Sequence, residues 1–418
     1  MEVITVLRSF ITLFVVLVVV AVMPVIAMAG VEVGGEMSVS GIWTKNHDFS
    51  KHHMTAGSSG RWWEQAAALS FIADVDNVKA YITMTVRDDG DHWGTLKSWN
   101  VGLADDDVAY LEVPINSTFT VYAGRTLNDW GHGFWWQGAG VDEFKVSAKV
   151  NDNLTVGLYT DKVEEKDRLD LNGDMDDYGL PIEYVTNAFT IGFLPVFSHH
   201  DDYTDYALPS QPYIKREKGM SYDAYFTING DKVKVMGELA MADGTLFEVV
   251  DVDGDGNPEQ HNKPFGAFLL AEFDMNPVTL TAAAAYAKNA FTADDQFNPT
   301  LMFGTDQSTA IVDFGAAPQD FAYAVVLGAS TAMSEAVTAG VKGAYALLSS
   351  RNATQVWELD ATLDVQLAES TTWSFGIAYL KPMGIKESDP YLDTDTTTDA
   401  GITRDPAISA FQSISYEF

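Results

Sequence analysis

The chain has 418 residues, no cysteine, and 59 acidic against 25 basic side chains, which gives a formal net charge of −34. The lack of cysteine excludes disulfides, cysteine-ligated zinc or iron–sulfur sites and covalent haem attachment. The negative charge repels phosphate backbones and excludes general nucleic-acid binding. Aromatic residues make up 12% of the chain, which argues against wholesale disorder. A soluble protein of this length would form about two or three domains.

Residues 1–29 have the pattern of a secretory signal peptide. Arg8 precedes an apolar stretch over 10–26, and Ala27-Met28-Ala29 provides the small residues that come before a cleavage site. An N-terminal membrane anchor is the alternative, although the apolar stretch is short for one. The sequence therefore predicts a signal peptide over 1–29 and a single mature domain over 30–418.

After position 30, apolar residues recur at every second position. Between Val78 and Val86 the even positions are apolar, and between Trp357 and Leu367 the odd positions are apolar. In a strand these two sets of positions lie on opposite faces. A helix would need a period of about 3.6 residues, which no long segment shows. The mature chain is therefore predicted to be all-β, with its hydrophobic content spread as stripes that face lipid.

Short turns alternate along the chain with longer polar connections. The short turns lie at Asp74–Asn77, Pro114–Ser117, Asn151–Asn153, Thr186–Asn187, Asn229–Asp231, Asp274–Pro277, Met333–Glu335 and Ala368–Thr371. The other connections are about 46–61, 88–104, 127–140, 161–179, 199–218, 243–263, 289–317, 349–353 and 383–407. This arrangement predicts a transmembrane antiparallel β-barrel of about 18 strands (16–18), with short periplasmic turns and long extracellular loops.

A soluble sandwich or repeat array is the alternative fold. Such a protein needs neither strands of membrane length nor turns sorted by length onto opposite ends. In addition, aromatic residues lie near strand ends on the apolar face, as in interfacial girdles. They are Trp43, Tyr286, Tyr345, Trp357, Trp373, Tyr379 and Tyr416.

The last segment, 407–418, has Ile414, Tyr416 and Phe418 on one face and ends on the aromatic Phe418. It resembles the terminal strand of Gram-negative outer-membrane β-barrel porins. The resemblance implies that Tyr416 and Phe418 act as the signal read by the barrel-assembly machinery. It also implies that the chain lies in the cell outer membrane, in contact with lipid and lipopolysaccharide.

A second stretch, 122–134, reads Tyr-Ala-Gly-Arg-Thr-Leu-Asn-Asp-Trp-Gly-His-Gly-Phe. It is similar to a Gly-Arg-Gln…Gly-Asp-Gly stretch of alginate-export-like porins. Thr126 replaces the glutamine and His132 stands where aspartate is common. No substrate is implied by this resemblance.

A barrel of this size is wide enough for an aqueous lumen, and the face opposite the apolar stripes is its candidate lining. Wall charges there include Glu112, Glu238 and Glu272. Lys342 precedes Glu358 and Asp360 by one strand, so these charges are expected to face one another. The pore-lining and constriction candidates are Lys79, Arg87, Arg125, Asp129, Trp130, His132, Trp135, Trp136, Lys145, Lys342, Glu358, Asp360 and Asp364. They form either a transverse field at a constriction or a set of mutually compensating wall charges.

The third long connection, 127–140, is the constriction candidate. It is rich in aromatic residues and glycine, and folding into the lumen would shelter its rings, on which sugars or aromatic solutes could stack. Packing on a neighbouring loop or in the lipid interface is the alternative. Arg125 has the parity of the outward positions, so either a bulge turns it inward or it snorkels at the interface.

The negative charge is concentrated in the long loops. Residues 161–179 hold eight acidic and three basic side chains. Within 243–263, carboxylates alternate and a glycine follows them, which is the opening of a calcium loop. The candidate metal ligands are Asp251, Asp253, Asp255, Asn257 and Glu259. A solvated acidic loop is the alternative. The sequence predicts no required cofactor, and calcium in this extracellular loop is the one metal it indicates.

These patterns predict a porin for passive diffusion of ions and small polar solutes. The acidic loops raise the local cation concentration and predict a mild cation preference. The alternative is a structural or adhesive barrel whose acidic loops bind calcium or surface partners. No catalytic residues are assigned, because the His52-His53 and His199-His200 pairs lie in loops without a Gly-x-Ser-x-Gly motif. Monomer and homotrimer both stay open, and the transported solute is not named.

Overall fold

The computed structural model of the chain contains a single sheet of 19 named strands. It describes residues 31–45, 59–75, 78–88, 108–127, 129–135, 140–164, 175–200, 219–243, 263–289, 291–293, 297–303, 314–316, 320–348, 353–385 and 406–418. Residues 1–30 lie outside these ranges, so the predicted signal peptide stays a prediction. Within the described residues, no helix is long and apolar enough to cross a bilayer.

The strands follow one another around the sheet in chain order. They are β1 (Val31–Lys45), β2 (Ser59–Val75), β3 (Val78–Asp88), β4 (Ala109–Pro114), β5 (Phe119–Leu127), β6 (Gly140–Lys149), β7 (Leu154–Glu164), β8 (Met175–Gly179), β9 (Ile182–Val185), β10 (Phe189–His200), β11 (Gly219–Asn229), β12 (Val233–Ala242), β13 (Phe265–Asp274), β14 (Val278–Lys288), β15 (Phe321–Ser334), β16 (Val337–Leu347), β17 (Ala353–Ala368), β18 (Thr371–Ile385) and β19 (Ala407–Glu417).

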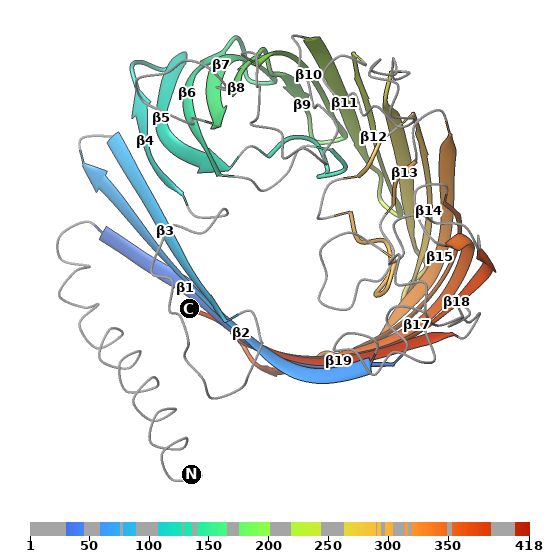
Figure 1. Cartoon of the computed structure of the whole chain (residues 1–418). Helices are drawn as coiled ribbons and strands as arrows, with labels where there is room; N and C mark the ends of the chain where they lie inside the picture. The colour runs from blue at the N-terminus through green and yellow to red at the C-terminus, as the bar shows by residue number, and fades with distance from the viewer. Residues whose placement is uncertain are drawn as a thin grey trace, which may run out of the picture.

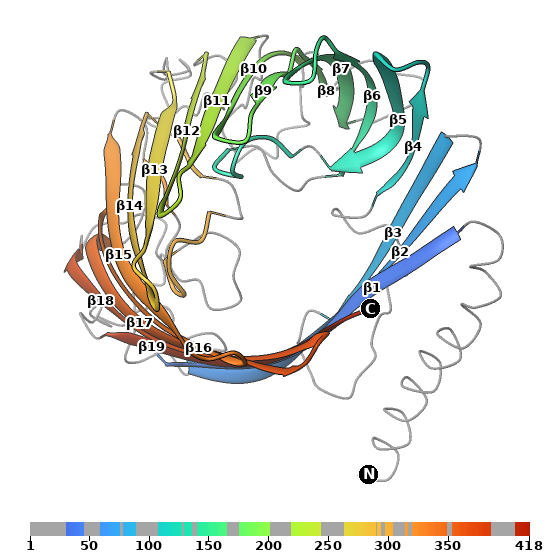
Figure 2. The same ribbon diagram turned by 180° about the vertical axis from the view of Figure 1, so that it is seen from behind.

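The sheet closes on itself because β1 pairs with both β2 and β19 (Figures 1 and 2). All pairings are antiparallel. β8 and β9 both pair with β7 and with β10, so they are two pieces of one strand that is interrupted at Leu180-Pro181. Counting them once reduces the 19 named strands to 18. The predicted antiparallel barrel of about 18 strands is confirmed.

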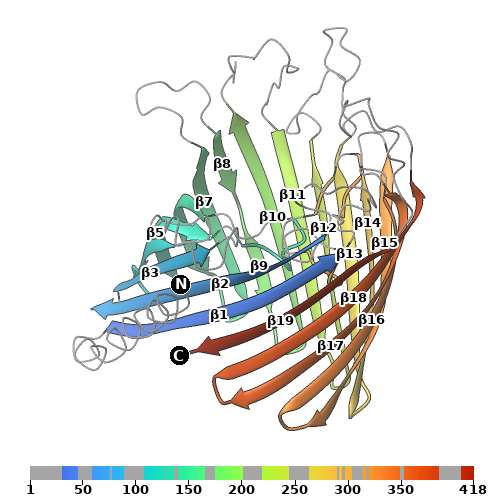
Figure 3. The same ribbon diagram turned by 60° about the horizontal axis from the view of Figure 1, so that its bottom comes forward.

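The short turns lie at one end of the barrel (Figure 3). Their polar side chains bond the turn backbone, as the Asn and Thr content of these segments favours. Asn116 Oδ1 accepts the N–H groups of Thr118 and Phe119 at 2.8 and 2.9 Å. Asn151 accepts two N–H groups in the same way in the turn between β6 and β7. These local bonds fix the hairpins that the sequence predicts.

The outer face of the barrel is apolar and exposed. Ile82, Leu269 and Leu359 are 45%, 48% and 56% exposed, and each lies at the outward parity of its strand. Aromatic side chains gather on this face where β14 to β18 approach the long connections. Tyr323 and Tyr345 are 6.2 Å apart, and Trp357 and Tyr379 are 5.2 Å apart. A closed sheet with this surface satisfies its backbone groups without water and faces lipid.

A second apolar region lies inside the barrel, and the sequence interpretation did not include it. On β15, Ala322, Ala324 and Val326 point inward and are buried, while Tyr323 and Val325 point outward. Small inward residues of β14 to β19 form an apolar bed, on which chain segments inside the barrel pack. The interpretation of the hydrophobic content as lipid-facing stripes alone was therefore wrong for these strands.

Candidate functional site

The segment after β5, residues 129–135, folds into the barrel (Figure 1). Its backbone wraps around the carboxylate of Glu238, a 2% exposed wall residue of β12. The N–H groups of His132, Phe134 and Trp135 donate to this carboxylate at 2.5, 3.2 and 3.2 Å. The structure thus answers the question left open for the 127–140 connection, because its described part lies in the lumen.

Two glycines give the segment its curvature. Gly131 and Gly133 have φ values of +68° and +70°, in the left-handed region that glycine adopts without strain. A Cβ at Gly131 would also lie 2.5 Å from a Glu238 carboxylate oxygen. Left-handed residues at alternate positions turn successive N–H groups to the same side and form an anion-binding nest. Here the group bound in the nest is the carboxylate of the wall residue Glu238.

The described parts of the connection between β14 and β15 are residues 291–293, 297–303 and 314–316. They form a second segment inside the barrel. Glu358 accepts the Thr300 hydroxyl at 2.8 Å and the Met302 N–H at 2.7 Å. Asp360 accepts the Leu301 N–H at 3.1 Å. Both carboxylates belong to β17 and are 2% exposed. They therefore hold a loop against the wall and do not face an open lumen.

Lys342 faces Asp360 across the β16–β17 register, as the sequence analysis expected. Its ammonium group donates to the Pro299 carbonyl at 3.3 Å. A basic and two acidic wall residues thus contact the same inward segment.

Aromatic rings join the two inward segments. Phe134 of the first segment is fully buried, and its ring lies 4.8 Å from that of Phe297 and 5.2 Å from that of Phe291. Phe268 of the β13 wall packs against Phe134 at 5.2 Å. Ring pairs at these distances add packing energy beyond their buried area. The two segments therefore form one packed body inside the lumen.

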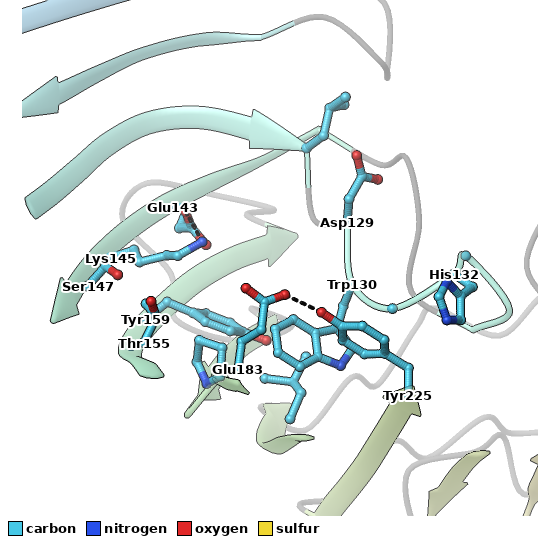
Figure 4. A pocket seen from close by; sticks show the side chains of 16 residues that line it. Asp129, Trp130, His132, Glu143, Lys145, Ser147, Thr155, Tyr159, Glu183 and Tyr225 are labelled. Atoms are coloured by element: carbon cyan, nitrogen blue, oxygen red, sulfur yellow. Dashed lines mark hydrogen bonds and ion pairs between the residues drawn. The ribbon is translucent and has the colours of Figure 1, made fainter. Parts of the chain in front are cut away.

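A cavity of about 590 Å³ lies between the first segment and the wall of β6 to β11. Lys145 and Glu143 approach to 3.8 Å on one side of it, and the Tyr225 hydroxyl donates to Glu183 on the other (Figure 4). The indole of Trp130 lies edge-on to Tyr225 with centroids 5.3 Å apart. Asp129 and His132 also line this cavity. Four predicted residues are thus brought together here, namely Asp129, Trp130, His132 and Lys145.

The remaining predicted lining residues have different positions. Lys79 is on the inner face, opposite Glu112 of β4. Arg125 is the strand-register partner of Asp142, with no register shift, and keeps the outward parity of Ala123, so its assignment to the lining was wrong. Asp364 is exposed at the inward parity of β17. Trp135 packs against the buried aromatic cluster. The side chain of Arg87, and the whole of Trp136, lie outside the described residues.

Several wall acids were placed wrongly or missed by the sequence analysis. Asp161 and Asp177 were assigned to the loop 161–179, yet β7 and β8 extend into that range and bury both residues on the inner face. Across the strand register, Glu143 faces Asp161, and Asp161 faces Asp177. Glu143 shares the parity of the predicted Lys145, a signal that could have identified it. Glu183 lies in β9, just after the interruption at Leu180-Pro181, and no pattern predicted its role.

The candidate calcium ligands, 251–259, lie outside the described residues. Among the residues that the structure does describe, no group of three or more His, Cys, Asp or Glu side chains could hold a metal ion. The calcium site therefore stays a prediction.

Solved structures of other proteins have a fold similar to that of this chain. No protein-family model and no curated protein matches the chain. OccAB1 of Acinetobacter baumannii has a similar structure, with a TM-score of 0.54 at 9% identity, over 92% of this chain and 97% of that one. OccK8 (OprE) of Pseudomonas aeruginosa gives 0.53 at 10% identity, over 93% and 98%. The outer membrane protein OprD of Pseudomonas aeruginosa gives 0.52 at 9% identity, over 92% and 93%.

The chain has the fold of an outer-membrane porin. The predicted resemblance to outer-membrane barrels is confirmed, and the cell outer membrane is the location that this fold fits. At these identities the comparison concerns the fold and not the solute. The resemblance of 122–134 to alginate-export-like porins is not shown by these structures.

Proposed function

We propose that the protein is a porin that lets ions and small polar solutes diffuse passively through a water-filled channel. The observation that supports this best is the pair of inward segments, each fastened to the wall by buried carboxylates. A barrel without a pathway has no need to hold two loops inside its lumen, whereas a channel needs such a constriction to select solutes. No catalytic step is part of the proposal.

A mild preference for cations is the second part of the proposal. The described inner wall and inward segments carry more carboxylates than ammonium groups, including Asp129, Glu143 and Glu183 around the cavity. A pathway lined by one sign of charge concentrates counter-ions of the opposite sign. The acidic long connections would act in the same direction at the mouth, most strongly at low salt.

Planar-bilayer recording of the refolded protein tests both parts. We expect stepwise, ohmic openings of stable size, and in a KCl gradient a reversal potential whose sign marks potassium as the more permeant ion. A folded, heat-modifiable barrel that conducts no current would contradict the channel. A reversal potential of the opposite sign would contradict only the cation preference.

The proposed partners are the barrel-assembly machinery and lipid at the last strand, and calcium or surface partners at the acidic loops. Tyr416 and Phe418 stack at 5.8 Å, and Tyr416 is exposed on the outer face, where the barrel-assembly machinery and lipid could contact them. The alternative is a structural or adhesive barrel whose acidic loops bind calcium or surface partners. An unchanged melting temperature between chelator and millimolar calcium would remove the calcium site proposed at 251–259. A homotrimer and a monomer are both compatible with the apolar outer face.

A further inference from the structure

A row of tyrosines crosses the inner wall next to the cavity. Tyr81 of β3 and Tyr110 of β4 are register partners, and their rings stack with centroids 4.6 Å apart and planes 13° apart. Tyr122 of β5 follows, with its ring 6.4 Å from that of Tyr110. The flanking Ile82 and Leu111 are exposed on the lipid side, so the three rings lie on the inner face.

The row leads directly into the cavity. The Lys145 ammonium group lies 5.5 Å from the centre of the Tyr122 ring and also pairs with Glu143 at the cavity wall. From there the cavity wall continues past Tyr159, Trp130 and Tyr225 (Figure 4), of which Tyr159 and Tyr225 are largely buried. Aromatic rings and polar groups thus line a path from β3 to β11. Because this path extends beyond the cavity to β3, it suits an elongated solute that reaches outside the cavity.

Most charged groups along this surface already have partners. Lys145 pairs with Glu143, Glu183 accepts the Tyr225 hydroxyl, and Glu112 accepts the Tyr81 hydroxyl at 3.1 Å. A charged solute would have to displace one of these partners. A neutral solute with many hydroxyl groups could instead add hydrogen bonds to carboxylate oxygens that retain free lone pairs.

Two polar groups at the cavity lack partners. The Tyr159 hydroxyl and the Trp130 indole nitrogen are buried atoms with no hydrogen-bond partner among the described residues, and Tyr159 as a whole is 5% exposed. Buried donors of this kind are costly unless something binds them. Both residues line the cavity, so a ligand there would satisfy them.

We propose that the tyrosine row and the cavity together bind a neutral, linear oligosaccharide during its passage. Sugar rings present apolar C–H faces that pack on aromatic rings, and hydroxyl groups at their edges that bond carboxylates, a phenol and an indole N–H. The cavity takes the leading sugar unit, because its volume of about 590 Å³ is that of a small-molecule site. The tyrosine row holds the units that follow. This inference rests on the proposed channel function.

Single-channel recording with maltohexaose as the probe tests the inference. We expect current block that saturates with maltohexaose concentration, and little block by polyethylene glycol of equal mass. Tyr110→Ala and Tyr122→Ala should each weaken the block about tenfold, the equivalent of losing one ring contact. Tyr122→Leu removes the ring and keeps most of the volume, so it covers the case in which the alanine variant folds poorly. Tyr323→Ala, on the lipid side, is the matched control. Maltohexaose should block this variant as strongly as it blocks the wild type.

Calorimetric titration of the detergent-solubilised protein with maltohexaose separates this inference from the channel itself. Heat of binding from a protein that conducts no current would support oligosaccharide binding at the tyrosine row and the cavity, and would reject the channel. If polyethylene glycol blocks a conducting protein as well as maltohexaose does, the channel is kept and oligosaccharide binding is overturned. Tighter block by choline than by maltohexaose, or equal block in the Tyr110, Tyr122 and Tyr323 variants, would also overturn it.

Discussion

Glu238 shows how a single residue sets the shape of the lumen. Its buried carboxylate receives three backbone N–H groups, and the left-handed Gly131 and Gly133 turn those groups toward it. Hydrogen bonds to a charged acceptor are worth about 1.5–3 kcal/mol each, more than neutral ones. This one side chain therefore fixes a segment that has no regular secondary structure of its own.

Replacing Glu238 by glutamine should release the segment 129–135. An amide keeps the size but loses the charge, and it turns an NH2 group toward N–H donors. We expect a larger unit conductance with flickering current and a stability loss of roughly 2 kcal/mol, measured by single-channel recording and thermal melting. Glu272→Gln makes the same change nearer the short-turn end of the neighbouring strand β13. Unchanged conductance in Glu238→Gln, or equal changes in both variants, would show that the clamp does not set the constriction.

At the scale of elements, the two inward segments depend on each other. Each has its own carboxylate clamp, on β12 for the first and on β17 for the second. The rings of Phe134, Phe297 and Phe291 then connect them. The inner face of β14 to β19 is built from small residues such as Ala287 and Ala346, which leave room for this body. The two inward segments are therefore held by two separate strands of the wall, β12 and β17.

Phe134→Ala should loosen both segments together. Removing a buried phenylalanine leaves a void and costs about 3–5 kcal/mol. We expect a lower melting temperature and a larger unit conductance than in the wild type. Phe144→Ala removes the same side chain from a lipid-facing position that is 51% exposed, and serves as the control. If the two variants melt and conduct alike, the aromatic cluster is not what holds the segments.

At the scale of the molecule, closure of the sheet separates an inner from an outer face, and the same charge has different effects on each. Lys145 lies at the cavity, whereas Arg125 of the neighbouring strand is the register partner of Asp142 and has the outward parity of β5. If the lumen conducts as proposed, of these two residues only Lys145 is placed to repel cations there.

Lys145→Gln should therefore increase cation selectivity, and Arg125→Gln should leave it unchanged. The expected readout is the reversal potential in a KCl gradient, which shifts further toward the potassium equilibrium potential for Lys145→Gln alone. The shift should shrink as salt rises, because screening shortens the range of the field. An equal shift in both variants would place Arg125 in the pathway as well.

Strand number, order and the lipid-facing side could be predicted because each depends on local pattern. The alternation around Ile82 and Leu359 marks the outward positions, and turns such as Asn151–Asn153 mark hairpin ends. The ends of strands next to long connections were harder to place. β7 and β8 continue through Asp161 and Asp177 because pairing with their neighbours outweighs the low strand preference of aspartate.

The closed antiparallel barrel can be predicted from local pattern, because the two-residue period and the sorting of turns by length are properties of neighbouring residues. What lies inside the barrel depends on contacts between residues far apart in the chain. Glu238 meets His132 across 106 positions, and Glu358 meets Thr300 across 58. Contacts at such separations leave no local pattern, and a buried loop clamp looks like an ordinary wall charge in the sequence. Closure of the sheet brings these residues together, so that the wall carboxylates hold the inward segments.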